Sequence, residues 1–322
     1  MKTNIIRIPC MPKDHRSAPM LSDLIESWEA HTCSHLKQST ASIYSGILRA
    51  HIQPAFGQMP PEELSAASIE AFLAEKSKTL APSTVANIST VLHSLLEHGH
   101  ATGLFPRTIT WTCPSGMSGK TAEVLQSREK KRLVEHLIYN THSNTQVDES
   151  FGLLLCLYTG MRLGEICALR WEDISPKGAI SIRRTIQRIS DPTTAGHTKI
   201  IFDTPKSQSS NRIIPMPLFL RKQMGSIRKA DNCFLLTGTP DYIEPRTMQN
   251  HFKATLKKCG IRPVNFHTLR HTFATDCVSA GFDPKTLSAI LGHADVSITL
   301  NTYVHPSFDV KRRFMDKLSP RI

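Results

Sequence analysis

The sequence lacks long apolar runs. No window approaches the roughly 20 apolar residues that a membrane-spanning helix requires. The N-terminal stretch MKTNIIRIPCMPKDH also lacks the apolar segment of a secretory signal peptide. These absences predict a protein that has no membrane partner and works in the cytoplasm.

Several common binding motifs are also missing. The 8 cysteines form no CxxC pair and mostly lie in apolar stretches, where free thiols behave as small hydrophobic side chains and indicate a reducing compartment. No acidic cluster and no complete GxxxxGK(S/T) phosphate-binding loop occurs. We therefore expect no metal site and no cofactor.

What the sequence has in excess is positive charge. The formal net charge is +12 at pH 7, yet residues 1–126 are neutral, with 10 basic and 10 acidic residues. The whole excess therefore lies in residues 127–322. A basic surface of this size favours a polyanionic partner, most often nucleic acid, with a membrane surface as the weaker alternative.

The hydrophobic pattern divides the chain into two domains. Residues 1–20 form an irregular lead-in, and residues 21–105 contain four segments with helical spacing of apolar residues. Among these, Ser22 and Ser83 are expected N-caps, Pro54 is expected to stop the second helix, and Gly99 to end the fourth. Residues 106–126 are rich in Pro and Gly and predict a linker.

Residues 127–322 combine helices with three short strand-like runs, at 179–189, 198–204 and 211–216. The last two runs flank the polar stretch PKSQSS and predict a hairpin. A nearly all-apolar helix is expected at 148–160, ended by Gly160, and another helix begins after Asp283. The predicted fold is mainly α: an all-α four-helix domain followed by an α+β domain with a small antiparallel sheet.

A set of basic, imidazole and phenolic side chains recurs in the C-terminal domain. Taken singly, each has an ordinary structural explanation, such as a surface ion pair, a solvated hairpin lysine, a core histidine, a helix cap or a tyrosine filling an amphipathic helix. The residues are Arg162, Glu165, Lys206, His267, Arg270, His293 and Tyr303.

Taken together, these side chains suit phosphodiester chemistry. Two guanidinium groups match the two non-bridging oxygens, where charge builds up during in-line attack. Imidazoles can donate to those oxygens or relay protons near neutral pH. A lysine can protonate a departing alkoxide, and a tyrosine can form a covalent ester with phosphorus. None of these roles requires a metal.

In these motifs the chain resembles the tyrosine recombinase family, which includes phage integrases and Xer-like enzymes. The similar motifs, in order, are TGMRLGEICALRWEDI, KSQSSNR, HTLRHTFAT, LGH and TLNTYVH. The N-terminal pattern STASIYSGILRAHIQPAFGQMPPEEL resembles the family's four-helix core-binding domain. The resemblance implies a SAM-like core-binding domain at 21–105 and a tyrosine recombinase catalytic domain at 127–322, which ends in a C-terminal helix.

The resemblance also implies an active site. Glu165 would support it, and His267 would be a proton-transfer or hydrogen-bonding partner. The implied catalytic residues are Arg162, Lys206, His267, Arg270, His293 and Tyr303.

The reaction that the resemblance implies is strand exchange without ATP. Tyr303 would attack a backbone phosphate and leave a 3′-phosphotyrosyl bond and a free 5′-hydroxyl. Arg162 and Arg270 would clamp the phosphate, with His293 donating to it. Lys206 would protonate the leaving 5′-oxygen.

The implied partner is a double-stranded DNA recombination site, bound by a homotetramer close to the nucleoid. DNA-bending or directionality factors are further implied partners, and the biological role would be integration, excision or resolution of a mobile element or replicon. The amphipathic segment at 305–318 would dock on a neighbouring subunit, although it could instead pack on its own domain. Because the N-terminal domain is neutral, base reading would fall to polar side chains there, such as Arg49, Ser83 and Asn87.

Three other functions remain open from the sequence. The same scaffold could be a catalytically silent DNA-binding accessory protein, which a cleavage assay would reveal. It could also be a type IB topoisomerase-like enzyme that relaxes DNA as a monomer. A basic scaffold protein without chemistry would leave the clustered motifs as coincidence.

Overall fold

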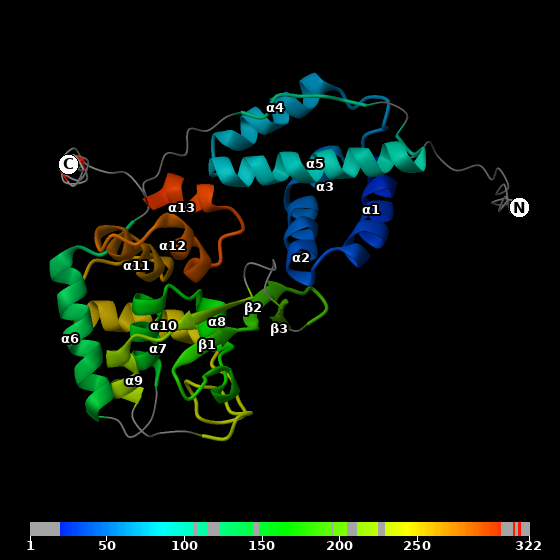
Figure 1. Cartoon of the computed structure of the whole chain (residues 1–322). Helices are drawn as coiled ribbons and strands as arrows, with labels where there is room; N and C mark the ends of the chain where they lie inside the picture. Colours follow the sequence, from blue (N-terminus) through cyan, green and yellow to red (C-terminus); the bar gives the residue numbers. More distant parts are fainter. Residues whose placement is uncertain are drawn as a thin grey trace, which may run out of the picture. The chain divides into compact units, whose positions relative to one another are not determined.

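The computed structural model describes residues 20–105, 108–114, 123–143, 148–194, 196–204, 211–224 and 229–303, together with residues 312, 315 and 316. The chain forms two compact units (Figure 1). The first unit comprises Met1–Gly119 and Ile189–Thr198, and the second comprises Lys120–Arg188 and Lys199–Ile322. Each unit encloses its own hydrophobic core.

The helices of the first unit pack around Trp28 and Leu48, both fully buried. All four predicted helical segments are present, and the second is continued by a π-helical turn and a short further helix. The elements are α1 (Leu21–His35), α2 (Gln38–Ile47), η1 (Leu48–Ile52), α3 (Gln53–Phe56), α4 (Ala66–Ser77) and α5 (Pro82–Thr102).

The predicted ends of three helices in this unit are wrong. Neither serine is an N-cap: Ser22 lies inside α1, whose N-cap is Met20, and Ser83 lies inside α5, which begins at Pro82. Pro54 does not stop the second helix, because the π turn η1 lies before it and places the proline in the first turn of α3. Proline is tolerated there, since the first turn of a helix has no partner for its N–H groups.

Gly99 does not end α5, which continues to Thr102 and closes on Gly103 in the left-handed conformation. Gly99 instead permits a close approach inside the bundle. A Cβ at this position would lie 2.8 Å from Phe105 Cβ and 2.9 Å from Leu24 Cδ2.

The second unit is built around α7 (Glu149–Thr159), the predicted all-apolar helix. Nearly all of its residues are buried, and it contacts α6, α8, α9, α10 and α11 (Figure 1). The other helices of the unit are α6 (Ser127–Ser143), α8 (Leu163–Cys167), η2 (Trp171–Asp173), α9 (Leu218–Met224), α10 (Pro245–Lys258), α11 (His267–Ser279), α12 (Pro284–Leu291) and α13 (Val296–Tyr303).

The strands pair differently from the sequence prediction. β1 (Ala179–Ile182) pairs antiparallel with β4 (Arg212–Pro215), and β2 (Thr185–Ser190) pairs with β3 (Thr198–Asp203). The predicted hairpin between 198–204 and 211–216 is therefore wrong. The run at 179–189 divides into β1 and β2 at Arg183 and Arg184, and Arg184 forms ion pairs with Glu172 and Asp173.

The mainly α fold with small antiparallel pairing is confirmed. None of the helices described has the length and apolar content needed to cross a bilayer. The cysteines that the structure describes are all free thiols.

Candidate active site

The turn between α7 and α8 places the first arginine. Gly160 ends α7 with φ 65°, and Arg162 is the N-cap of α8. The Arg162 backbone N–H donates to Glu165 Oε2 at 2.8 Å, and its guanidinium donates to Glu165 Oε1 at 2.9 Å. A second guanidinium nitrogen donates to the Gly292 carbonyl at 3.2 Å, so the side chain is held from two sides.

Glu165 is the centre of a buried charge network. Its side chain is 4% exposed, which rules out the surface-pair interpretation of Arg162 and Glu165. Arg212 on β4 donates to both carboxylate oxygens, at 3.0 and 2.9 Å, and also to the Ile290 carbonyl at 2.6 Å. Burial raises the pKa of Glu165, but hydrogen bonding and charge from Arg212, together with the charge of Arg162, outweigh it and hold the pKa below its ordinary value.

Arg270 on α11 is almost fully buried, with 1% exposure. Its guanidinium donates to the Gly160 carbonyl at 2.7 Å and to the Leu291 carbonyl at 2.8 Å. Burial, with repulsion from Arg162, lowers its pKa to about 9, so the group still carries its charge at neutral pH. A desolvated cation held by neutral carbonyls gains from an anionic ligand, as a phosphate would be.

Tyr303 ends α13 and is 9% exposed. Its hydroxyl forms a 2.7 Å hydrogen bond with His271 Nδ1. The ring of His293 lies parallel to the phenol ring, with centroids 6.5 Å apart and an interplanar angle of 8°. Burial raises the pKa of Tyr303, while Arg270 and Arg162 partly oppose the shift. The phenol is therefore neutral at physiological pH.

The histidines of this cluster are held neutral. Burial, with the charges of neighbouring basic groups, lowers the pKa of His293 to about 4. Partial desolvation and the proximity of His271 lower the pKa of His267 to about 4 as well. His293 Nδ1 is hydrogen-bonded to the hydroxyl of Thr299, at 2.8 Å.

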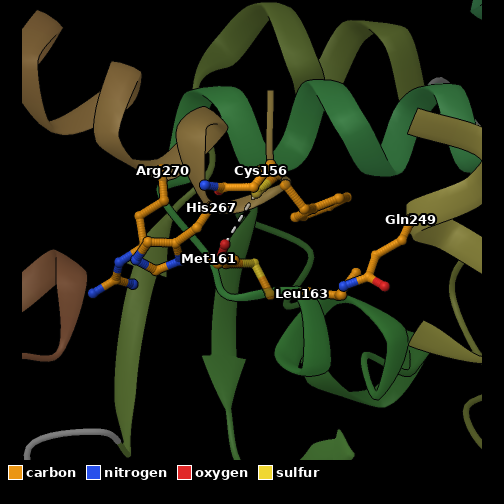
Figure 2. Close-up of a pocket in the computed structure, with 8 residues that line it drawn as sticks. Cys156, Met161, Leu163, Gln249, His267 and Arg270 are labelled. Atoms are coloured by element: carbon orange, nitrogen blue, oxygen red, sulfur yellow. Dashed lines mark hydrogen bonds between the residues drawn. The ribbon is translucent and has the colours of Figure 1, made fainter. Parts of the chain in front are cut away.

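A cavity of about 270 Å³ is lined on one side by Arg270 and His267 of α11 (Figure 2). Gln249 of α10 lies on the opposite side, and the Cys156 thiol donates to the Met161 carbonyl at 3.0 Å within the wall. The full lining is Cys156, Met161, Leu163, Gln249, Asn265, Phe266, His267 and Arg270. The cavity is thus lined by apolar and neutral polar side chains together with one cation, Arg270.

Most of the predicted site residues are brought together. The residues in this cluster are Arg162, Glu165, His267, Arg270, His293 and Tyr303. Lys206 and most of the segment 305–318 lie outside the described residues. The proposed base-reading residues Arg49, Ser83 and Asn87 are exposed on the first unit, and their role stays a prediction.

Three members of the cluster were not predicted from the sequence: Arg212, His271 and Thr299. His271 follows His267 at HxxxH spacing, which places both imidazoles on one side of α11 with ring centroids 4.6 Å apart. That spacing could have revealed it. Arg212 carries no local signal because its partner Glu165 is 47 positions away, and Thr299 follows His293 by six positions, a spacing that does not place two side chains on one helix face. Within the part of the chain that the structure describes, no group of three or more His, Cys, Asp or Glu side chains could hold a metal ion.

Two family models match the chain. Residues 123–309 match the phage integrase family, and residues 20–77 match its N-terminal SAM-like domain. The chain belongs to the phage integrase family. The predicted family and fold class are thereby confirmed.

Among curated relatives, a tyrosine recombinase XerC-like protein of Caldanaerobacter subterraneus is 31% identical over 172 residues, covering 47% of this chain and 44% of the relative. The transposase of transposon Tn916 from Enterococcus faecalis is 28% identical over 214 residues, covering 61% of this chain and 51% of the relative. This integrase family member thus spans about half the length of the curated relatives it matches.

Solved structures share the fold. The integrase of transposon Tn1549 in complex with transposon right end DNA has a TM-score of 0.70 and 21% identity, covering 93% of this chain and 99% of that one. A lambda integrase tetramer bound to a Holliday junction has a TM-score of 0.62 and 17% identity, covering 90% of this chain and 80% of that one.

Proposed function

We propose that this protein is a site-specific DNA recombinase, which cleaves and rejoins duplex DNA through a 3′-phosphotyrosyl intermediate. The observation that carries the proposal is the convergence of the Tyr303 phenol with two arginines and three imidazoles in one cluster. Arg270 supports it most strongly, because a buried guanidinium held by carbonyl oxygens is suited to an incoming phosphate.

In the proposed cleavage step, the phenol oxygen of Tyr303 attacks the phosphorus. The new bond joins that oxygen to phosphorus, and the bond from phosphorus to the 5′-oxygen breaks. Lys206 supplies the proton that the leaving 5′-oxygen needs. Arg162 and Arg270 stabilise the charge on the two non-bridging oxygens, where fixed cations act most strongly.

The imidazole of His293 is proposed to donate to the same phosphate. Its Nδ1 is bound to Thr299, which leaves Nε2 for the ligand. The phosphotyrosyl ester keeps the bond energy of the phosphodiester, so a 5′-hydroxyl from a second duplex reverses the step without ATP.

The proposed partners follow from the family and its members. We propose a duplex recombination site as substrate and a homotetramer on DNA, in which the segment 305–318 docks on a neighbouring subunit. Relatives named for transposons favour integration or excision of a mobile element. Cytoplasmic location at the nucleoid, and accessory bending or directionality factors, belong to the same proposal.

The proposal is tested by trapping the covalent intermediate. The protein is incubated with end-labelled duplexes that carry a nick within a randomised segment, and complexes that survive denaturing gels are recovered and sequenced. We expect wild type to form such complexes at a defined sequence. Tyr303→Phe should form none while still binding DNA, and Tyr139→Phe, a change at an exposed tyrosine, should behave as wild type.

Two results would contradict the proposal. A covalent complex formed by Tyr303→Phe would show that another residue is the nucleophile. Relaxation of arbitrary supercoiled plasmid by monomeric protein, without sequence preference among trapped complexes, would instead indicate a topoisomerase-like enzyme.

A further inference from the structure

The phenol of Tyr303 needs a proton acceptor before it can attack phosphorus. It is 9% exposed, and burial raises its pKa, so the nucleophile rests in the neutral form. Bulk water reaches a buried hydroxyl poorly. The acceptor must therefore be a side chain within hydrogen-bonding distance of the phenol oxygen.

His271 is at that distance. Its Nδ1 lies 2.7 Å from the phenol oxygen, and the ring is fixed on α11 next to Arg270. The two partners come from different helices and are 32 positions apart in the sequence, so the contact is a product of the fold. With its proton on Nε2, the ring presents the Nδ1 lone pair to the phenol O–H.

The other two histidines are committed elsewhere. His293 uses Nδ1 to bind Thr299, and its free nitrogen serves the phosphate. His267 lies at the start of α11, lines the cavity together with Arg270, and meets His271 edge-on at an interplanar angle of 87°. The contact with the phenol oxygen is made by His271.

We propose that His271 is the general base that takes the proton of Tyr303 during cleavage and returns it during rejoining. This assignment rests on the proposed function and concerns a residue outside the set implied by the family motifs. In cleavage, the phenol O–H bond breaks and its proton passes to Nδ1 as the new O–P bond forms. In rejoining, the tyrosine oxygen leaves phosphorus and recovers that proton from the imidazolium.

The electrostatic surroundings suit a base. Burial, followed by repulsion from Arg270, lowers the pKa of His271, so the ring is neutral and ready to accept a proton near pH 7. The groups that face it are His267 and Arg270 from α11, Tyr303 from α13 and, across the phenol, His293. The charge that develops on the imidazole during attack is balanced by the phosphate bound beside it.

The matched variant is His271→Asn. The asparagine carbonyl can accept the phenol hydrogen bond close to the position of Nδ1, but it cannot take the proton. We expect covalent-complex formation on the recovered nicked duplex to slow by roughly 100-fold to 10,000-fold near neutral pH, the range for loss of a general base. DNA binding and the melting temperature should stay close to wild type, and His271→Gln provides a second variant if Asn impairs folding.

Three further measurements separate a base from a merely structural role. The rate of His271→Asn should rise steadily with pH, because hydroxide replaces the missing base, whereas the wild-type rate should level off. A 3-fluorotyrosine at position 303, with its more acidic phenol, should restore part of the variant's rate. A substrate whose 5′-bridging oxygen is replaced by sulfur should not restore the variant's rate. Sulfur makes the leaving group depart more easily but does not help to activate the nucleophile.

The outcomes are distinguishable from failure of the proposed function. If wild type forms no covalent complex, the recombinase proposal fails. If wild type forms the complex and His271→Asn does so at the same rate, His271 is not the base. If His271→Asn is slow but its cleavage rate responds neither to pH nor to fluorotyrosine, the assignment is also overturned. If instead His267→Asn cleaves slowly, with a rate that rises with pH and is partly restored by fluorotyrosine, the general base is His267.

Discussion

Arg212 binds both carboxylate oxygens of Glu165, although the two residues are 47 positions apart in the sequence and lie on a strand and a helix. The pair is buried, with side-chain exposures of 5% and 4%. Glu165 also binds Arg162, which is proposed to bind the DNA phosphate. The Arg212–Glu165 pair therefore fixes the position of Arg162. Its loss should affect both stability and cleavage.

Replacing Arg212 by Met should destabilise the fold, because it leaves Glu165 with one cationic partner in place of two. Removing one partner of a buried ion pair costs about 3–5 kcal/mol, and we expect a loss near the lower end since Arg162 remains. Chemical denaturation measures the change. Arg188→Met is the control, because its pair with Glu244 lies at the surface and should contribute less than about 1 kcal/mol. Equal losses for the two variants would contradict the role of the buried pair.

Gly160→Ala should disturb the site through the backbone. Gly160 has φ 65°, and a Cβ there would lie 2.5 Å from the Phe273 ring and 2.8 Å from Leu291. Left-handed strain costs about 1–2 kcal/mol and overpacking about 1–3 kcal/mol, so a total near 3 kcal/mol is expected in a denaturation experiment. Cleavage should also slow, because the Gly160 carbonyl accepts a hydrogen bond from Arg270.

The control for this change is Gly281→Ala in the same unit. Gly281 has φ 86°, but nothing lies within 4 Å of its added Cβ. Gly281→Ala should therefore lower the free energy of unfolding only by the conformational strain, about 1–2 kcal/mol. If the two variants lost comparable amounts of unfolding free energy, crowding around the added Cβ at Gly160 would be unimportant.

Features with a local signal could be predicted from the sequence. The all-apolar run at 148–160 gave a buried helix that ends at Gly160, and Asp283 caps α12 by accepting from the Thr286 N–H. The family-like motifs also contain six residues that the structure brings together in one cluster. For the helix end at Gly160 and the cap at Asp283, the determining contacts lie within about one helical turn of the residue.

Features set by distant partners could not be predicted. Strand β4 pairs with β1, with buried Ile214 directly opposite buried Ile180 in the register, and nothing near either strand in the sequence specifies that choice. Arg270 was expected among the catalytic residues, but its near-complete burial has no local signal, because its hydrogen-bond partners are the distant carbonyls of Gly160 and Leu291. The expected N-caps Ser22 and Ser83 were wrong because α1 begins at Leu21, whose N–H donates to the Met59 carbonyl, and α5 begins at Pro82, a residue favoured at the first helical position.

Acid should weaken the fold through the histidines of the cluster. The pKa values of His267 and His293 fall from 6.5 to about 4 on folding. Between these pH values the unfolded chain binds protons that the folded protein does not, so stability is greatest above pH 6.5 and falls as the pH drops toward 4. Protonation of Glu165, whose pKa is also lowered, acts in the same direction at lower pH.

Urea denaturation at about pH 7.5 and about pH 5 measures this dependence. The double variant His267→Gln, His293→Gln should lose less stability between the two conditions than wild type. His100→Gln, on the exposed end of α5, should keep the full wild-type loss. An unchanged loss in the double variant would mean that other groups carry the acid sensitivity.

Thr299 should control cleavage through His293. The hydroxyl of this fully buried threonine is bound to His293 Nδ1 at 2.8 Å, which fixes both the ring orientation and the nitrogen that faces the phosphate. Thr299→Val keeps the shape of the side chain but removes the hydroxyl that binds His293. Because the His293 ring is then no longer held, single-turnover cleavage should slow by roughly 10-fold to 100-fold, as small misplacements of catalytic groups do. Thr299→Ser keeps the hydroxyl and should cleave at close to the wild-type rate despite losing a buried methyl group. If Ser and Val slowed cleavage equally, packing of the threonine methyl, rather than its hydrogen bond, would be what positions His293.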